Sequence, residues 1–238
     1  MPDLTKRSSE LEIMDDLTCE GETLNQTLRE LEFINKWLGG NQITINAISE
    51  LLESHPRDAR PITIVDLGCG GGEMLRVIDT WAKKNSRRFN LIGVDANPYI
   101  IGFAKKNLKD LSHLQFVAMD IFSEEFSNQR YDIVIGTLFY HHFSDAQLIG
   151  FFKQLRNQVN LGFIINDIHR HWLAYHSIKM LTHFFSKSSM VKYDAPLSVR
   201  RAFKKDDLIK ILSEAKIDEF KINWRWAFRW QVIAKISG

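Results

Sequence analysis

A glycine-rich turn directly after a short apolar run constrains the fold of this chain more than any other feature. Residues Ile62–Asp66 are predicted to form a buried strand, glycines follow at 68, 70 and 72, and Glu73–Lys84 has the periodicity of an amphipathic helix. Glycine permits backbone conformations closed to other residues and a close approach of the main chain to a ligand. The free N–H groups of the helix start then face the edge where open α/β sheets bind ligands.

Strands and helices alternate after this turn, which predicts a parallel sheet with helices on both faces. The predicted strands are Ile62–Asp66, Asn90–Asp95, Leu114–Met119, Tyr131–Gly136, Leu161–Asn166, Ile217–Trp224 and Ala227–Ile236. Only a turn separates the last two, so they should pair antiparallel. The sequence therefore predicts a Rossmann-like, doubly wound α/β fold with a mostly parallel seven-stranded sheet and an antiparallel last strand.

Helical segments flank this pattern. Residues 1–60 are predicted to form an N-terminal helical cap, because Leu24, Leu28, Leu31 and Ile34 line one helix face and Ile43–Leu52 resumes the pattern. A charged turn between Pro56 and Pro61 marks the boundary with a domain over 61–238. A helical insertion is expected around 171–200, as a helix over His171–Lys187 followed by an irregular stretch over Ser188–Val199.

Composition argues against several classes of protein. Lys and Arg number 31 against 29 Asp and Glu, so the net charge of +2 produces no strong positive field that would indicate binding of nucleic acid. The two cysteines, Cys19 and Cys69, have no metal-type spacing and favour a reducing compartment. The first twenty residues lack the apolar core of a secretory signal, and no apolar run approaches the roughly 20 residues of a membrane span. We expect a cytoplasmic protein, either a monomer or a homodimer.

Two acidic residues stand at the ends of the strands that follow the glycine turn. Asp95 can accept hydrogen bonds from both hydroxyls of a ribose, and Asp120 lies one strand over, where a purine amino group would reach it. Either acid could instead cap the following helix, and Asp95 is well placed to cap the helix that opens at Pro98. Their combination with Asp66 favours a nucleotide-like ligand.

These residues resemble the motifs of class I S-adenosylmethionine (SAM)-dependent methyltransferases over about Ile62 to Asn166. That family has acid-x-Gly-x-Gly-x-Gly after the first strand and an acid after each of the next two strands. The resemblance implies SAM as cofactor, S-adenosylhomocysteine (SAH) as product, and cofactor contacts from Asp66, Gly68, Cys69, Gly70, Gly72, Asp95, Ala96, Asn97, Asp120, Ile121 and Thr137. A nicotinamide dehydrogenase would have glycine at 73, where this chain has Glu73.

Candidate catalytic residues follow the fourth and fifth strands. His141 and His142 offer a base with an ordinary pKa near 6.5, suited to removing a phenolic or hydroxyl proton. His169 and Arg170 could hold an acceptor hydroxyl or carboxylate. The alternatives are a packed or solvated histidine and an ordinary helix start. No cysteine or tight ligand spacing accompanies the histidines, so we expect no metal.

Three segments outside the core motifs, Glu32–Gly40, His169–Tyr175 and Pro196–Phe203, are similar to bacterial small-molecule methyltransferases that modify polyketides, phenols or quinones. Trp37, Tyr140 and Trp172 are candidates for an apolar substrate pocket, although aromatic residues at helical spacing also serve as core. The sequence thus predicts methyl transfer, most readily O-methylation, to a small aromatic or lipophilic acceptor. A SAM-binding sensor or subunit without catalysis, and a methyltransferase of RNA or protein, are the alternatives.

Overall fold

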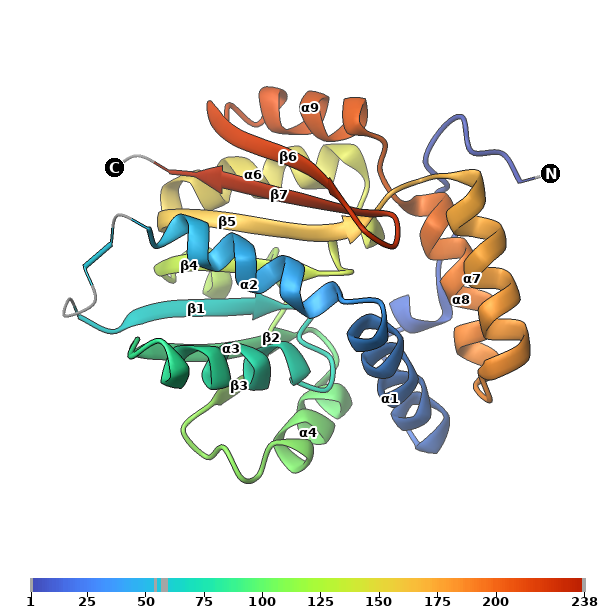
Figure 1. The fold of residues 1–238 in the computed structure, drawn as a ribbon, viewed down its shortest axis with the longest axis horizontal. Coiled ribbons are helices and arrows are strands. Elements are labelled where there is room, and N and C mark those ends of the chain that lie inside the picture. The colour runs from blue at the N-terminus through green and yellow to red at the C-terminus, as the bar shows by residue number, and fades with distance from the viewer. Residues whose placement is uncertain (1, 54, 57–59, 237–238) are drawn as a thin grey trace.

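The computed structural model describes residues 2–53, 55–56 and 60–236, so part of the predicted boundary turn, 57–59, lies outside the described residues. One sheet of seven strands has the order β3-β2-β1-β4-β5-β7-β6 (Figure 1). The strands are β1 Ile62–Leu67, β2 Phe89–Asp95, β3 Gln115–Ala118, β4 Tyr131–Thr137, β5 Val159–Ile168, β6 Glu219–Arg225 and β7 Arg229–Lys235. The first five pair in parallel and β7 runs antiparallel to both neighbours, which confirms the predicted fold class.

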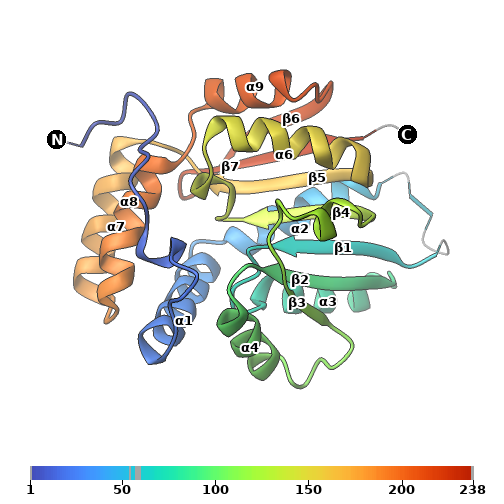
Figure 2. The ribbon, with the colours of Figure 1, turned by 180° about the vertical axis from the view of Figure 1, so that it is seen from behind.

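Helices cover both faces of this sheet (Figures 1 and 2). The α-helices are α1 Glu22–Trp37, α2 Gly40–Leu51, α3 Glu73–Lys84, α4 Pro98–Asn107, α5 Glu124–Ser127, α6 Asp145–Gln158, α7 Trp172–Phe185, α8 Ser189–Arg201 and α9 Lys205–Glu214. Two short 3₁₀ turns are η1 Ile13–Asp15 and η2 Tyr140–His142. Among the described residues, no helix has both the length and the apolar character needed to cross a membrane.

Alternating side chains of the strands build a core on each face. In β1, Val65 packs in the core beneath α6 and α9, while Ile64 packs in the core beneath α2 and α3. This follows from the two-residue period of a strand buried on both faces. Fully burying one such aliphatic side chain contributes about 1.5–3 kcal/mol, so the two cores fix the sheet and the loops at its end.

A third layer covers the carboxyl ends of the parallel strands. The arrowheads of β1, β4 and β5 point toward α1, α7, α8 and the N-terminal segment with η1 (Figure 1). The predicted division of the chain at residue 60 stays a prediction. Helix α2, from the N-terminal part, packs directly on β5 and β7.

One local prediction is wrong. The stretch Ser188–Val199, expected to be irregular, is mostly helix α8, with Pro196 inside it. An interior proline costs a helix about 3 kcal/mol. Burial of Val191, Leu197 and Val199 offsets that cost at about 1.5–3 kcal/mol each. Tertiary packing against α1 and α7 therefore overrides the local signal.

Candidate active site

A cavity of about 920 Å³ opens at the carboxyl edge of the sheet, between the strands and the helical third layer. Its walls come from η1, α1, the glycine turn, the ends of β2 to β4, helices α7 and α8, and the β6–β7 hairpin. Ligand sites of small molecules commonly enclose about 300–1,000 Å³. The cavity is therefore large enough for a small-molecule ligand and lies where α/β sheets bind theirs.

The glycine turn between β1 and α3 needs its glycines. Gly68, Gly70 and Gly72 have φ of 63°, 50° and 81°, in the left-handed region that side chains disfavour. A Cβ atom on Gly68 would lie 2.2 Å from the Phe139 ring. Gly68 and Gly70 line the cavity, whereas Gly72 does not and caps α3.

Asp66, at the end of β1, lines the cavity and is almost fully buried. Burial and the neighbouring Asp95 raise the pKa of Asp66 to about 8. Burial also raises the pKa of Asp95, against the opposing effect of hydrogen bonds from backbone N–H groups. Two carboxyl groups that resist ionisation together suit a ligand that brings positive charge or hydroxyl donors.

Asp95 and Asp120, which follow β2 and β3, both line this side of the cavity. Asp95 accepts hydrogen bonds from the backbone N–H of Asn97 (3.0 Å) and of Gly70 (3.4 Å), so it links β2 to the glycine turn. Asp120 and buried Ile121 line the cavity beside it.

The other predicted cofactor residues divide between the cavity and its support. Cys69, Ala96 and Thr137 also line the cavity. Asn97 does not, because its buried amide caps α4 at Tyr99 N and donates to the Cys19 carbonyl (2.9 Å).

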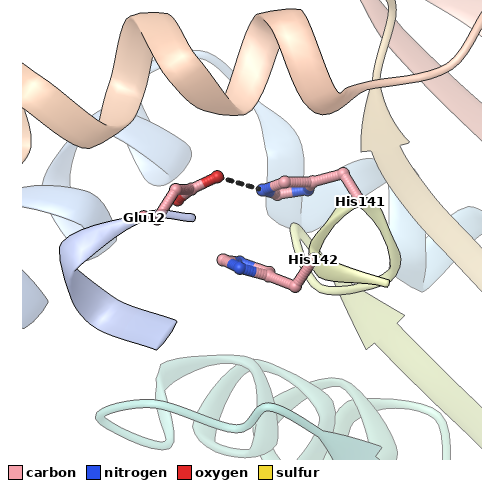
Figure 3. Close-up of side chains that lie close together, drawn as sticks. All are labelled: Glu12, His141 and His142. Atoms are coloured by element: carbon pink, nitrogen blue, oxygen red, sulfur yellow. Dashed lines mark ion pairs between the residues drawn. The ribbon is translucent and has the colours of Figure 1, made fainter. Parts of the chain in front are cut away.

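His141 is buried between two carboxylates. Its Nδ1 lies 2.7 Å from Asp167 Oδ1, and its Nε2 lies 3.6 Å from Glu12 Oε1, a contact that Figure 3 shows. Burial works against a charged imidazole, but Asp167 and Glu12 outweigh it and raise the pKa of His141 to about 9. Both ring nitrogens of His141 therefore face carboxylates.

His142 differs from its neighbour because, within the described residues, its Nδ1 has a carboxylate partner and its Nε2 has none. Its Nδ1 lies 2.6 Å from Asp15 Oδ1, and its side chain remains 22% exposed at the cavity wall. Despite burial, hydrogen bonds from His142 and Arg201 hold the pKa of Asp15 well below its usual range. An ionised Asp15 fixes the proton of neutral His142 on Nδ1, which leaves the Nε2 lone pair to accept a proton.

Glu12, His141 and His142 could together offer three ligand atoms to a metal ion, since these atoms lie within 4.8 Å of one another (Figure 3). Arg201 lies beside the same atoms, with Nε 3.9 Å from Glu12 Oε1 and Nη1 bonded to Asp15. A fixed guanidinium disfavours a divalent cation at this distance. We interpret the group as a network of ion pairs, and the absence of a metal stays a prediction.

The predicted pair after β5 does not line the cavity. Arg170 is buried and committed elsewhere, with Nη1 3.0 Å from Asp207 and 2.5 Å from the Ala202 carbonyl. His169 packs on the Trp230 ring, at 4.8 Å between centroids. Burial, His171 and Arg170 lower the pKa of His169 to about 4. Both residues support the edge of the sheet rather than contact a cavity ligand.

Of the three aromatic residues predicted for the substrate pocket, one lines the cavity and two do not. Trp37 lines the cavity. Tyr140 does not, because it is fully buried against Gly136, where a Cβ would lie 2.5 Å from its ring. Trp172 is exposed and also lies outside the cavity wall.

Several cavity residues were not among the sequence-based candidates. Glu12 and Asp15 belong to a polar segment without clear periodicity, and the available signal is the three-residue spacing of Leu11, Met14 and Leu17, which all line the cavity. Arg229 also lines it, and its signal is a charge at the start of a mostly apolar last strand.

The strand order, the reversed last strand and the glycine turn with its acidic strand ends define the Rossmann-like methyltransferase class. Within that class, residues 64–162 match the family described as Methyltransferase domain. This matched segment contains the glycine turn and the acidic strand ends in which the sequence resembles class I SAM-dependent methyltransferases.

A curated protein with a similar sequence is also described as a methyltransferase. An uncharacterised methyltransferase of Synechocystis is 28% identical over 114 residues, which are 46% of this chain and 50% of that protein. The chain thus spans about half the length of the curated relative it matches.

Solved structures share the fold. The plantazolicin methyltransferase in complex with SAH aligns at a TM-score of 0.64 with 16% identity, over 91% of this chain and 100% of that one. The magnesium protoporphyrin IX methyltransferase of Synechocystis with bound SAH aligns at 0.55 with 16% identity, over 87% of each chain. A CurJ carbon methyltransferase aligns at 0.62 with 16% identity, over 83% of this chain and 54% of that one.

Proposed function

We propose that this protein is a SAM-dependent methyltransferase that methylates a hydroxyl group of a small aromatic or lipophilic acceptor. The main observation behind this proposal is that two features line the same cavity. The glycine turn with Asp95 lies at one wall, and the Asp15–His142 pair lies at another. A mere binder of the cofactor would not need an oriented base.

The residues of the cavity fit the cofactor. Asp95 would accept ribose hydroxyls, Asp120 and Ile121 would hold the adenine, and Asp66 with the glycine turn would face the methionine part. When bound, SAM supplies an electrophilic methyl group. Two structural neighbours, the plantazolicin and magnesium protoporphyrin IX methyltransferases, are themselves known with SAH bound.

The chain's own residues would supply orientation, a proton acceptor and exclusion of water. His142 Nε2 would take the proton of the acceptor hydroxyl, and Asp15 would keep the imidazole in the required tautomer. Leu11, Met14 and Leu17 of the N-terminal segment line the cavity and would limit the access of water.

The acceptor class follows from the remaining walls. Trp37, Ile178, Leu181 and Phe228 all line the cavity, which suits an aromatic or lipophilic molecule. The structural neighbours act on chemically diverse acceptors, so this part of the proposal depends on the cavity alone.

The test uses turnover of a panel of phenols, catechols and quinols with SAM. We expect His142→Ala to lower kcat about 10²–10⁴-fold, the usual contribution of a general base, while SAH affinity stays unchanged. As a positioning residue, Asp15→Asn should lower kcat and change the pH profile of kcat, with little change in KM. His176→Ala, an exposed histidine of α7 outside the cavity wall, is the matched control.

Two outcomes would redirect the proposal. Full turnover by His142→Ala would show that another group, or none, takes the proton. Tight SAH binding with no turnover of any small acceptor would favour a SAM sensor, or, if label passes to cellular RNA or protein, a macromolecular methyltransferase.

A further inference from the structure

Arg229 is a buried cation in the wall of the cavity. It begins β7, is 4% exposed and lines the cavity beside the β6–β7 hairpin. Its Nη2 donates a hydrogen bond to Asn35 Oδ1 (3.0 Å), and Asn35 also lines the cavity. Its Nη1 is buried without a hydrogen-bond partner within the described part of the chain. A guanidinium has five donors, so this one has capacity left for a ligand.

Among the residues that the structure describes, no carboxylate lies within ion-pair distance of Arg229. The acid that acts on it is Asp167, which already binds His141 Nδ1 at 2.7 Å and the His141 backbone N–H at 3.1 Å. Burial lowers the pKa of Arg229 to about 10, with Asp167 opposing, so the group is charged at neutral pH. A buried charge without a close partner is costly, and a bound anion would remove that cost.

The hairpin that carries Arg229 has a strained backbone at the residues that line the cavity. Ala227 and Phe228 have φ of 59° and 54°, a left-handed conformation usually occupied by glycine or asparagine. Trp226, Ala227 and Phe228 line the cavity together with Arg229. Such strain persists where the surrounding structure enforces it, often at binding sites.

We propose that Arg229, oriented by Asn35, binds the carboxylate of an otherwise apolar acceptor. The inference rests on the proposed function and adds a charge to its acceptor. A guanidinium fork recognises a planar carboxylate through two parallel hydrogen bonds. The apolar lining around it, including Trp37 and Phe228, suits the rest of such a molecule.

The position of Arg229 assigns this anion to the acceptor rather than to the cofactor. The glycine turn follows β1, whereas Arg229 lies on β7, three strand spacings away in the order β1-β4-β5-β7. At about 4.8 Å per spacing, the two backbones lie roughly 14 Å apart. This separation favours an anion on the acceptor, and unchanged SAH affinity in Arg229→Met is the result that distinguishes it from the carboxylate of the cofactor.

The test is a binding experiment that needs no turnover. Benzoate, 3-phenylpropionate and decanoate, each against its primary amide, are titrated calorimetrically into protein saturated with SAH. We expect at least one carboxylate to bind about tenfold more tightly than its amide, as a charge-assisted pair allows. Arg229→Met should abolish this preference. Arg225→Met, in the same hairpin but outside the cavity wall, should retain it.

Two further measurements distinguish a loss of carboxylate recognition from a loss of folding. Arg229→Met should keep SAH affinity and a melting temperature no lower than wild type, because it removes a buried charge that lacks a close partner. No carboxylate preference in any pair, a preference that persists in Arg229→Met, or loss of SAH affinity in that variant would each overturn the proposal. Failure of the carboxylate test with intact SAH binding leaves the proposed methyl transfer standing.

Discussion

At the scale of single residues, the carboxyl group of Asp66 occupies an environment that favours its neutral form. It is 2% exposed at the end of β1, and its pKa is raised to about 8 by burial and by Asp95. The folded protein therefore holds a proton there that the unfolded chain releases above its ordinary pKa. The contribution of Asp66 to the free energy of unfolding is therefore fully present below its ordinary pKa and is lost as pH rises toward 8.

Asp66→Asn tests this linkage in the protein without cofactor. The amide cannot ionise, so the variant should gain stability relative to wild type progressively between about pH 4 and pH 8, the interval between the ordinary and the raised pKa. We expect a gain on the order of a few kcal/mol at the upper end. Thermal unfolding measured across this range checks it. A stability difference that does not change with pH would show that Asp66 is already ionised.

Single residues also show what the sequence could reveal about the site. Asp66, Asp95 and Asp120 were predictable because each follows a strand, and the carboxyl ends of parallel strands meet at one edge. Asp15 and Arg229 were not, because their contacts bridge 127 and 194 positions to His142 and Asn35. No local period or motif encodes such pairs.

At the scale of elements, the N-terminal segment is held against the cavity by α8. Asp194 accepts hydrogen bonds from the backbone N–H groups of Ile13 (2.8 Å) and Met14 (3.2 Å), and Ser198 donates to Glu12 (3.0 Å). These bonds fix η1, which carries Asp15 to His142. Helix α8 thus helps to hold the segment at the site.

Asp194→Ala should loosen this attachment. Loss of a carboxylate that caps a helix start costs about 1 kcal/mol, which raises the population of the detached segment about fivefold. Limited proteolysis within residues 10–20 should accelerate by that factor. Lys192→Ala, exposed on the same helix, should not change the rate. Equal cleavage of all three proteins would show that other contacts hold the segment.

Elements differ in how well their sequence predicts them. The strands and flanking helices of the sheet were predictable because a buried parallel sheet imposes long apolar runs separated by amphipathic helices. Helix α8 was not, because Pro196 and its polar neighbours give a breaker signal that only packing against α1 and α7 overrides. Helix α6 begins directly after Ser144, whose side chain accepts a hydrogen bond from the backbone N–H of Gln147, a local signal that the sequence analysis did not use.

At the scale of the whole molecule, the fold brings the proposed cofactor wall and the proposed acceptor wall to one cavity. The sheet supplies the glycine turn, Asp95 and η2, and the third layer of α1, α7, α8 and the N-terminal segment covers them (Figure 2). Closing this layer over the strand ends would exclude water and strengthen each electrostatic contact inside.

The most direct measurement is calorimetric titration of SAH into the purified protein and into Asp95→Ala. Asp95 lines the cavity at the end of β2 and would receive the ribose hydroxyls. We expect micromolar binding by wild type and at least a tenfold loss in the variant, since a charged hydrogen-bond partner contributes about 1.5–3 kcal/mol. Absence of SAH binding by wild type, or equal binding by both proteins, would contradict the assignment of this cavity to SAM.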